Sequence, residues 1–169
     1  VLKKAMFKRN RSNLHAVKDV SFSIKTGETF GLVGESGSGK STVARLIAGL
    51  LHIDKGTVKL FDKDVTNNFK GMEAVAAQRS LQMIFQDPFS SLNARMSVED
   101  IVAEPIHYYK TATSNRQVKQ IVRDLLDHVG LGTNAMIKYP HEFSGGQRQR
   151  ISIARALASR PKILICDEP

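Results

Sequence analysis

The stretch Gly34-Glu35-Ser36-Gly37-Ser38-Gly39-Lys40-Ser41-Thr42 decides the fold of this chain. Its glycines allow the backbone to curl around an anion, with the N–H groups pointing inward. Lys40 supplies a point charge for the β- and γ-phosphates of a nucleoside triphosphate, and Ser41 offers a hydroxyl to Mg²⁺. The stretch therefore predicts a phosphate-binding P-loop.

The residues on either side of this loop support that prediction. Residues 29–33, Thr-Phe-Gly-Leu-Val, predict a short buried strand before the loop, and residues 43–48 predict a helix after it. Phosphate would then lie at a helix N-terminus, where free N–H groups and the helix dipole favour negative charge. The alternative, a Gly/Ser-rich turn that arises by chance, does not account for a strand and a helix in register with the loop.

A second candidate anion site lies at residues 143–150, Phe-Ser-Gly-Gly-Gln-Arg-Gln-Arg. Ser144 is placed as the N-cap of a helix that continues into an apolar-periodic stretch. Gly145 and Gly146 leave the start of that helix bare, so a phosphate can approach its backbone. A capped helix with a flexible start explains the same residues. Beside a P-loop, however, a second half-site for phosphate suggests that two chains share each nucleotide.

The third candidate site follows an apolar run at residues 163–166. The run predicts a central parallel strand that is buried on both faces, and ligands bind at the carboxyl ends of such strands. Asp167 would hold Mg²⁺, directly or through water, and Glu168 would polarise the attacking water. A solvated turn is the alternative for this pair of carboxylates. Cys166, the single cysteine, is expected to be a small core residue within the strand.

Taken together, these motifs resemble those of the ABC ATPases. Residues 34–42, 144–147 and 167–168 resemble the Walker A, signature and Walker B motifs, and Gln86 resembles the Q-loop glutamine. The residues most similar to a subfamily are 86–93, Gln-Asp-Pro-Phe-Ser-Ser-Leu-Asn, and 141–150, which resemble the ATPase subunits of dipeptide and oligopeptide importers. Ala94 departs from that pattern, because these importers usually continue with proline.

The resemblance implies an α/β fold. Its core would be a P-loop NTPase (RecA-like) domain, with a small antiparallel β subdomain and a helical ABC subdomain. Residues 1–86 and 161–169 would form the nucleotide-binding core, and residues 87–160 the helical subdomain, within a single domain over 1–169 that is incomplete at its C-terminal end. The family continues with an interface loop and a switch histidine, so we expect the chain to be a fragment of a longer protein.

The resemblance also assigns roles to individual residues. Glu168 and Gln86 would be catalytic, and Mg²⁺ would be held by Ser41, Gln86 and Asp167. Phe7 would stack on adenine, with His15 as the other candidate and an edge-packed phenylalanine as the structural alternative. The residues that would contact ATP are Gly34, Glu35, Ser36, Gly37, Ser38, Gly39, Lys40, Ser41, Thr42, Phe7, Ser144, Gly145, Gly146 and Gln147.

The implied function is ATP binding and hydrolysis that power an ABC importer of di- or oligopeptides. Its partners would be a second ATPase subunit in a head-to-tail dimer, transmembrane permease subunits and, indirectly, an extracytoplasmic substrate-binding protein. The protein would be peripheral, on the cytoplasmic face of the membrane. An ABC ATPase that acts on nucleic acid or ribosomes is one alternative, and a catalytically incomplete nucleotide-binding module is another. The first would carry coiled-coil or zinc-hook insertions or a second cassette, and none occurs in this stretch.

Composition agrees with this interpretation. The 169 residues suffice for one compact domain with a core, and no apolar run reaches membrane-spanning length. A net charge of +9 is typical of proteins that bind nucleic acid or anionic lipid. In this chain, part of the positive charge serves the triphosphate. No aromatic residues interleave with the basic ones, so nucleic acid is not expected. Much of the remaining charge lies in a run typical of a solvated edge, at Lys3, Lys4, Lys8, Arg9 and Arg11.

Local patterns predict further elements. Residues 20–24 and 57–61 read as strands. Ser97 begins a capping box, and an apolar stripe from Val118 to Val129 predicts a core helix that Gly130 ends. The segment 86–93 is predicted to couple the nucleotide to the membrane subunits, because it links a ligand-contacting glutamine to the helical part of the chain.

Overall fold

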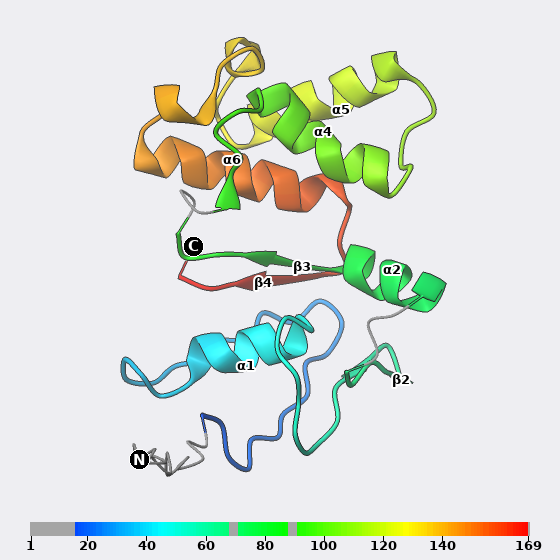
Figure 1. The fold of residues 1–169 in the computed structure, drawn as a ribbon, viewed down its shortest axis with the longest axis vertical. Coiled ribbons are helices and arrows are strands. Elements are labelled where there is room, and N and C mark those ends of the chain that lie inside the picture. Colours follow the sequence, from blue (N-terminus) through cyan, green and yellow to red (C-terminus); the bar gives the residue numbers. More distant parts are fainter. Residues whose placement is uncertain (1–15, 68–70, 88–90, 169) are drawn as a thin grey trace, which may run out of the picture. The chain divides into compact units, whose positions relative to one another are not determined.

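The computed structural model describes residues 16–67, 71–87 and 91–168. The predicted adenine-stacking candidates Phe7 and His15 lie outside the described residues. The chain, coloured by sequence position in Figure 1, divides into two compact units, Val1–Val43 and Ala44–Pro169.

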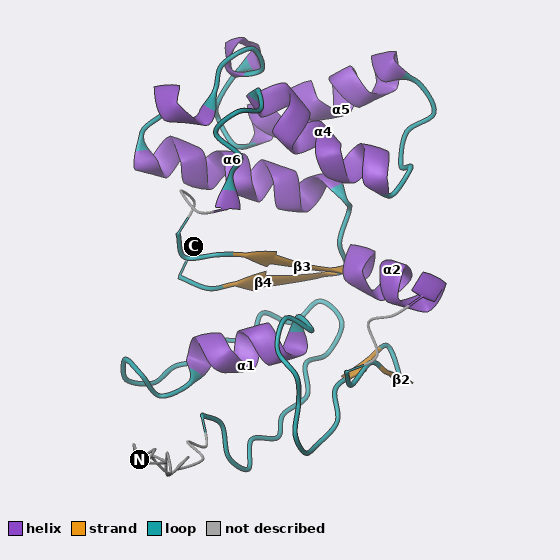
Figure 2. Ribbon diagram, viewed as in Figure 1, coloured by secondary structure: helices purple, strands orange, loops and turns teal. Residues whose placement is uncertain are grey.

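The first unit is a loop-rich segment that leads into α1 (Lys40–Ile47). A turn at Gly27, where φ is 79°, joins two arms, and Phe22 stacks on Phe30 with ring centroids 4.9 Å apart. The predictions of strands at 20–24 and 29–33 are wrong: both arms are loop (Figure 2), and Val33 is 93% exposed. A strand needs a neighbour to accept its backbone hydrogen bonds, and the described backbone bonds of these arms close only the turn, from Glu28 N to Lys25 O.

The second unit contains two small sheets. β1 (Lys59–Leu60) pairs antiparallel with β2 (Lys63–Asp64), so the predicted strand at 57–61 is present but shorter. β3 (Leu81–Ile84) follows α2 (Gly71–Ser80) and pairs in parallel with β4 (Ile163–Cys166). The register places Leu81 opposite Ile163 and Ile84 opposite Cys166.

The prediction that β4 is parallel is confirmed, but the prediction that both of its faces are buried is wrong. Leu164 is 39% exposed and Cys166 is exposed, whereas Ile163 and Ile165 pack against a small core. Successive side chains of a strand point to opposite faces, so Ile163 and Ile165 lie on the face of β4 that packs against this core, and Leu164 and Cys166 lie on the other, more exposed face. Partial burial nevertheless raises the pKa of the Cys166 thiol above its ordinary value.

Three helices build the main core of this unit: α4 (Val98–Tyr108), α5 (Asn115–His128) and α6 (Gly145–Ala158). They pack against one another, and α6 also packs against β3 (Figure 1). Short 3₁₀ turns, η1 (Thr133–Ala135) and η2 (Pro140–Glu142), lie between α5 and α6. The fully buried side chains at the centre are Ile101, Ile106, Leu126, Ile151, Val98, Val102 and Val122.

The helix boundaries follow the sequence signals. Ser97 caps α4, because its hydroxyl oxygen accepts from Asp100 N–H and its O–H donates to the Asp100 carboxylate at 2.6 Å. The stripe on α5 is core, as predicted: Val118, Val122 and Leu126 are buried. The chain turns at Gly130, where φ is 71°. None of the helices within the described residues has the length and apolar character needed to span a bilayer.

Candidate functional site

The predicted phosphate loop leads directly into α1. Ser38 N–H donates to Glu35 O at 3.2 Å, and Val43 N–H donates to Gly39 O at 2.9 Å, so the loop closes on itself before the helix begins. Gly37 and Gly39 have φ of 81° and 96°, a region that side chains rarely adopt. A Cβ atom at Gly39 would lie 2.7 Å from the backbone oxygen of Ala16. The loop therefore requires glycine at this position for two separate reasons.

Lys40 lies across this loop. Its ammonium donates to Gly34 O at 2.8 Å and to Glu35 O at 2.7 Å. An ammonium group has three donors, so the two carbonyls hold its position and leave one donor for an anion. Lys40 is also the first residue of α1, where the dipole and the backbone N–H groups of the first turn favour negative charge. A curled backbone, a fixed cation and a helix start fit a bound phosphate chain.

The second group of predicted residues meets at the carboxyl ends of β3 and β4. Asp167 N–H donates to Ile84 O at 3.0 Å, which extends the parallel ladder past the last strand residue. The Gln86 side-chain amide donates to a carboxylate oxygen of Glu168. Asp167 is buried, with 8% of its surface exposed, whereas Gln86 and Glu168 are exposed. The structure thus brings together Gln86 and Glu168, two residues 82 positions apart in the chain.

The oxygen-bearing side chains at the two motifs lie in separate units of the chain, Ser41 in the first and Asp167 in the second. Within residues 16–67, 71–87 and 91–168, no three His, Cys, Asp or Glu side chains cluster as a metal site would require. Mg²⁺ in nucleotide sites takes one or two protein ligands, with phosphate and water oxygens completing the octahedron. A buried carboxylate such as Asp167 and a hydroxyl such as Ser41 are ligands of that kind.

The predicted signature residues begin α6. Ser144 is its N-cap: its hydroxyl accepts from Gln147 N–H at 3.4 Å, and Gln147 Oε1 accepts from Ser144 N–H at 3.0 Å. Gly145 and Gly146 form the exposed first turn, and a Cβ atom at Gly146 would meet nothing within 4 Å. Arg148 fixes the segment before the helix, because its Nε donates to Pro140 O at 2.7 Å. The first turn of α6 is therefore capped by hydrogen bonds between Ser144 and Gln147, and its glycines are exposed.

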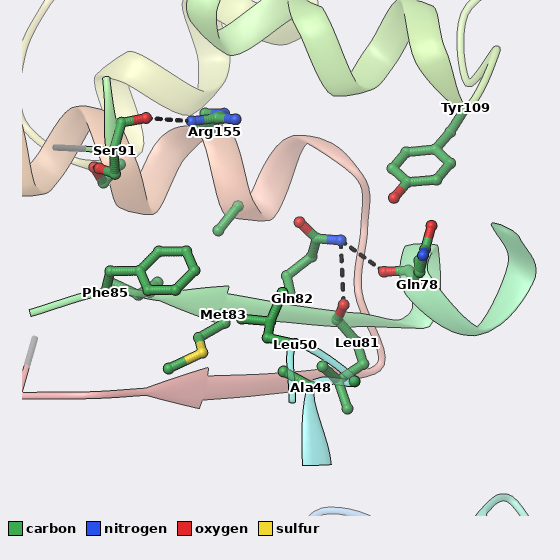
Figure 3. Close-up of a pocket in the computed structure, with 14 residues that line it drawn as sticks. Ala48, Leu50, Gln78, Leu81, Gln82, Met83, Phe85, Ser91, Tyr109 and Arg155 are labelled. Carbon is green, nitrogen blue, oxygen red and sulfur yellow. Dashed lines mark hydrogen bonds between the residues drawn. The ribbon is translucent and has the colours of Figure 1, made fainter. Parts of the chain in front are cut away.

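One functional feature was missed from the sequence: polar contacts between α6 and the chain that leaves β3. Gln149 Nε2 donates to Phe85 O at 3.5 Å, and Arg155 Nη1 donates to Ser91 O at 2.7 Å. The two residues of each pair are 64 positions apart, so no local sequence pattern predicts these contacts. The residues Phe85, Ser91 and Arg155 also line a cavity of about 290 Å³ between α6 and β3 (Figure 3).

The far wall of this cavity is partly polar. Gln82 Nε2 donates to Gln78 O at 2.7 Å, and Tyr109 lies beside it (Figure 3). Burial raises the pKa of Tyr109 above its ordinary value. The cavity therefore runs along β3 from Phe85 to Gln82 and reaches Tyr109, the C-cap residue of α4.

The loop that opens α1 and the carboxylates beyond a parallel strand define an α/β protein of the P-loop nucleoside-triphosphatase class. The chain belongs to the ABC transporter family, whose family model matches residues 17–169. The importer-type resemblance seen in the sequence is confirmed, and the departure at Ala94 does not alter it.

Relatives of known name are similar over nearly the whole chain. It is 50% identical over 164 residues to the oligopeptide transport ATP-binding protein OppF of Streptococcus mutans, which covers 96% of this chain and 53% of that protein. It is 47% identical over 166 residues to OppF of Escherichia coli, which covers 98% of this chain and 49% of that protein. The chain thus spans about half the length of these relatives.

Solved structures agree with the fold. The dimeric bacterial ABC transporter cassette MJ0796 superposes with a TM-score of 0.81 at 30% identity, over 95% of this chain and 68% of that one. A post-hydrolysis dimer of the same cassette, bound to ADP and Pi, superposes with a TM-score of 0.78 at 31% identity, over 89% of this chain and 65% of that one.

Proposed function

We propose that the protein to which this chain belongs binds and hydrolyses ATP, with Mg²⁺, to power an importer of oligopeptides. The observation that carries the proposal is the hydrogen bond from Gln86 to Glu168 beyond the paired strands β3 and β4. An amide that orients a carboxylate at the carboxyl end of a parallel strand is suited to positioning water and charge for phosphoryl transfer. The P-loop supplies the matching phosphate site.

The P-loop residues, 34–42, would hold the phosphates through backbone N–H groups, and Lys40 would add charge-assisted contacts. Glu168 would orient or deprotonate the attacking water, and Gln86 would keep its carboxylate in place. Mg²⁺, when bound, neutralises charge on the phosphate oxygens, and Ser41, Gln86 and Asp167 are the residues that would hold it. Phe7 remains the proposed adenine-stacking residue.

The start of α6 is proposed to act on the nucleotide of a second subunit. Ser144, Gly145, Gly146 and Gln147 present an exposed, capped helix N-terminus, which is a ready site for an anion. The cassette MJ0796, which shares this fold, is described as a dimer. A head-to-tail pair would place this helix start against the γ-phosphate held by the partner's P-loop.

The division of the chain stays a proposal as well: residues 1–86 and 161–169 as the nucleotide-binding core, and 87–160 as the helical subdomain. The segment Gln86–Asn93 would link the two and carry changes at the nucleotide to the permease subunits. It begins beside Glu168 and passes the cavity lined by Phe85 and Ser91, a concave surface that a permease loop could enter.

Oligopeptide as cargo rests on the names of the relatives, which are oligopeptide transport ATP-binding proteins. It implies transmembrane permease subunits, an extracytoplasmic substrate-binding protein as an indirect partner, and a peripheral location on the cytoplasmic face of the membrane. No observation favours the alternatives, an ABC ATPase acting on nucleic acid or ribosomes and a non-catalytic nucleotide-binding module.

The test is Glu168→Gln in the full-length protein assembled with its permease subunits. The amide keeps the shape of the side chain but loses its charge and basicity, so ATP binding should persist while hydrolysis falls by about a hundredfold or more. Glu99→Gln is the matched control, because the Glu99 carboxylate forms an ion pair with Lys119 at 3.6 Å on the helical surface. Hydrolysis by Glu168→Gln at the rate of the control would refute the assignment.

A further inference from the structure

Three polar side chains on α6 face the chain that leaves β3. Gln149, Ser152 and Arg155 are spaced three residues apart, so they lie along one side of the helix. We call them the polar row. Gln149 lies within the candidate anion motif 143–150, but none of the three side chains was assigned a role at the nucleotide.

The polar row holds two points of the backbone between β3 and α4. Gln149 Nε2 donates to Phe85 O at 3.5 Å. The Ser152 and Ser91 hydroxyls lie 3.1 Å apart, and Arg155 Nη1 donates to Ser91 O at 2.7 Å (Figure 3). Arg155 is itself fixed by an ion pair with Glu104 of α4 at 3.3 Å. The helix that starts at the signature residue Ser144 is therefore attached just before the proposed coupling loop, at Phe85, and within that loop, at Ser91.

The contact from Gln149 leads directly to the proposed catalytic pair. The oxygen that Gln149 bonds belongs to the peptide joining Phe85 to Gln86, and Gln86 donates to Glu168. A shift of α6 relative to β3 would rotate that peptide and with it the origin of the Gln86 side chain. This path is continuous within one unit of the chain, from the fifth residue of α6 to Glu168.

The Gln149 amide is incompletely satisfied. Its donor contact of 3.5 Å is at the outer limit of a hydrogen bond, and its buried Oε1 has no hydrogen-bond partner among the residues that the structure describes. Buried polar atoms of native proteins are almost always paired, and an unpaired one is costly. A second arrangement of α6 against β3 that shortens this contact would be favoured at this residue, which is what a two-state element requires.

We propose that Gln149 is a positioning residue that sets Gln86 against Glu168 according to the position of the signature helix. The inference rests on the proposed function, since it assigns Gln149 a part in hydrolysis. Engagement of the start of α6 by the partner's nucleotide would tighten the contact between Gln149 and Phe85. The two half-sites of the dimer would then be linked through the interior of each subunit.

The kinetic test uses the full-length protein assembled with its permease subunits. Gln149→Met removes both polar groups at similar length, and Gln149→Glu replaces the donor nitrogen by a carboxylate oxygen that cannot donate to Phe85 O. Both should lower kcat for ATP hydrolysis by between about twofold and tenfold, the range for one net hydrogen bond, with KM for ATP nearly unchanged. Gln120→Met is the control: Gln120 lies on the exposed face of α5, and its Nε2 donates to the Asp124 carboxylate at 2.7 Å.

A double-mutant cycle separates positioning from general destabilisation. If Gln149 acts through Gln86, adding Gln149→Met to Gln86→Ala should leave kcat where Gln86→Ala alone puts it. If the two losses multiply, Gln149 acts independently of Gln86 and the proposal is overturned. Equal kcat for Gln149→Met and the parent would overturn it as well.

Amide hydrogen exchange decides the same question without hydrolysis. Without nucleotide, exchange in the peptide containing Phe85 and Gln86 should be faster in Gln149→Met than in the parent and in Gln120→Met. Unchanged exchange would show that Gln149 does not hold this backbone. A parent that fails to hydrolyse ATP would count against the proposed function alone, because the exchange experiment still reports on Gln149.

Discussion

Replacing Gly39 by alanine should cost more ATP affinity than the same change at any other glycine of the first unit. The residue has φ of 96°, where an L side chain costs roughly 1–2 kcal/mol. Its new Cβ would also lie 2.7 Å from Ala16 O, a backbone atom that cannot rotate away. Overpacking of this kind adds about 1–3 kcal/mol, so the binding conformation of the loop would be destabilised by about 2–5 kcal/mol.

The strain lowers ATP affinity because it reduces the fraction of molecules whose loop has the phosphate-binding conformation. Apparent Kd rises by the inverse of the fraction of loops that keep the binding conformation, and each 1.4 kcal/mol corresponds to a factor of ten. Gly39→Ala should therefore weaken ATP binding at least thirtyfold, as measured by titration calorimetry on the full-length protein. Thermal unfolding of the same samples should show that the protein is still folded, because the strain is confined to a surface loop.

Two neighbouring glycines separate the two causes. Gly37 has φ of 81°, and a Cβ atom added there would have nothing within 4 Å, so Gly37→Ala carries the backbone strain alone and should weaken binding by about five- to thirtyfold. Gly27 has φ of 79° and equal space but lies in the turn between the two arms, so Gly27→Ala should leave ATP affinity unchanged. The reasoning fails if Gly39→Ala binds ATP as tightly as Gly37→Ala does.

Two further substitutions test the cation of the P-loop and the start of α6. Lys40→Ala removes the ammonium that lies across the loop, so Mg·ATP binding should be lost or severely weakened; unchanged affinity by calorimetry would refute the P-loop assignment. Ser144→Arg places a bulky cation at the open start of α6, so ATP-driven dimerisation should fail while the ATP affinity of the monomer stays close to that of the parent. Dimerisation is measured by size-exclusion chromatography with light scattering. Equal loss of monomer binding would show that this motif serves the chain's own site.

Sequence signals were most reliable where a local hydrogen bond fixes the structure. Ser97 and Ser144 were predicted as helix caps because their side chains reach N–H groups three residues ahead, and both bonds are present. The turn after α5 was predicted from Gly130 for a similar reason, since a positive φ is a property of one residue. These features depend on a few consecutive residues, so the sequence contains the whole interaction.

Predictions that depend on distant partners fared differently. Residues 29–33 have the composition of a buried strand, yet Val33 is almost fully exposed, because burial is decided by what packs on a segment and not by the segment itself. The contact of Gln149 with Phe85 was missed for the same reason. The sequence marks Gln149 as a helical residue, but the position of β3 determines which backbone oxygen it meets.

The meeting of Gln86 and Glu168 lies between these cases. Glu168 was predicted to follow a strand and Gln86 was identified by resemblance, and neither prediction fixes their separation. The register does: Ile84 lies opposite Cys166, and both side chains follow two residues later, so equal offsets along parallel strands bring them level. A register shifted by one residue would set Gln86 beside Asp167, with its side chain on the other face of the sheet. Pairing of the two proposed catalytic residues is thus a consequence of strand register, in which Leu81 lies opposite Ile163 and Ile84 lies opposite Cys166.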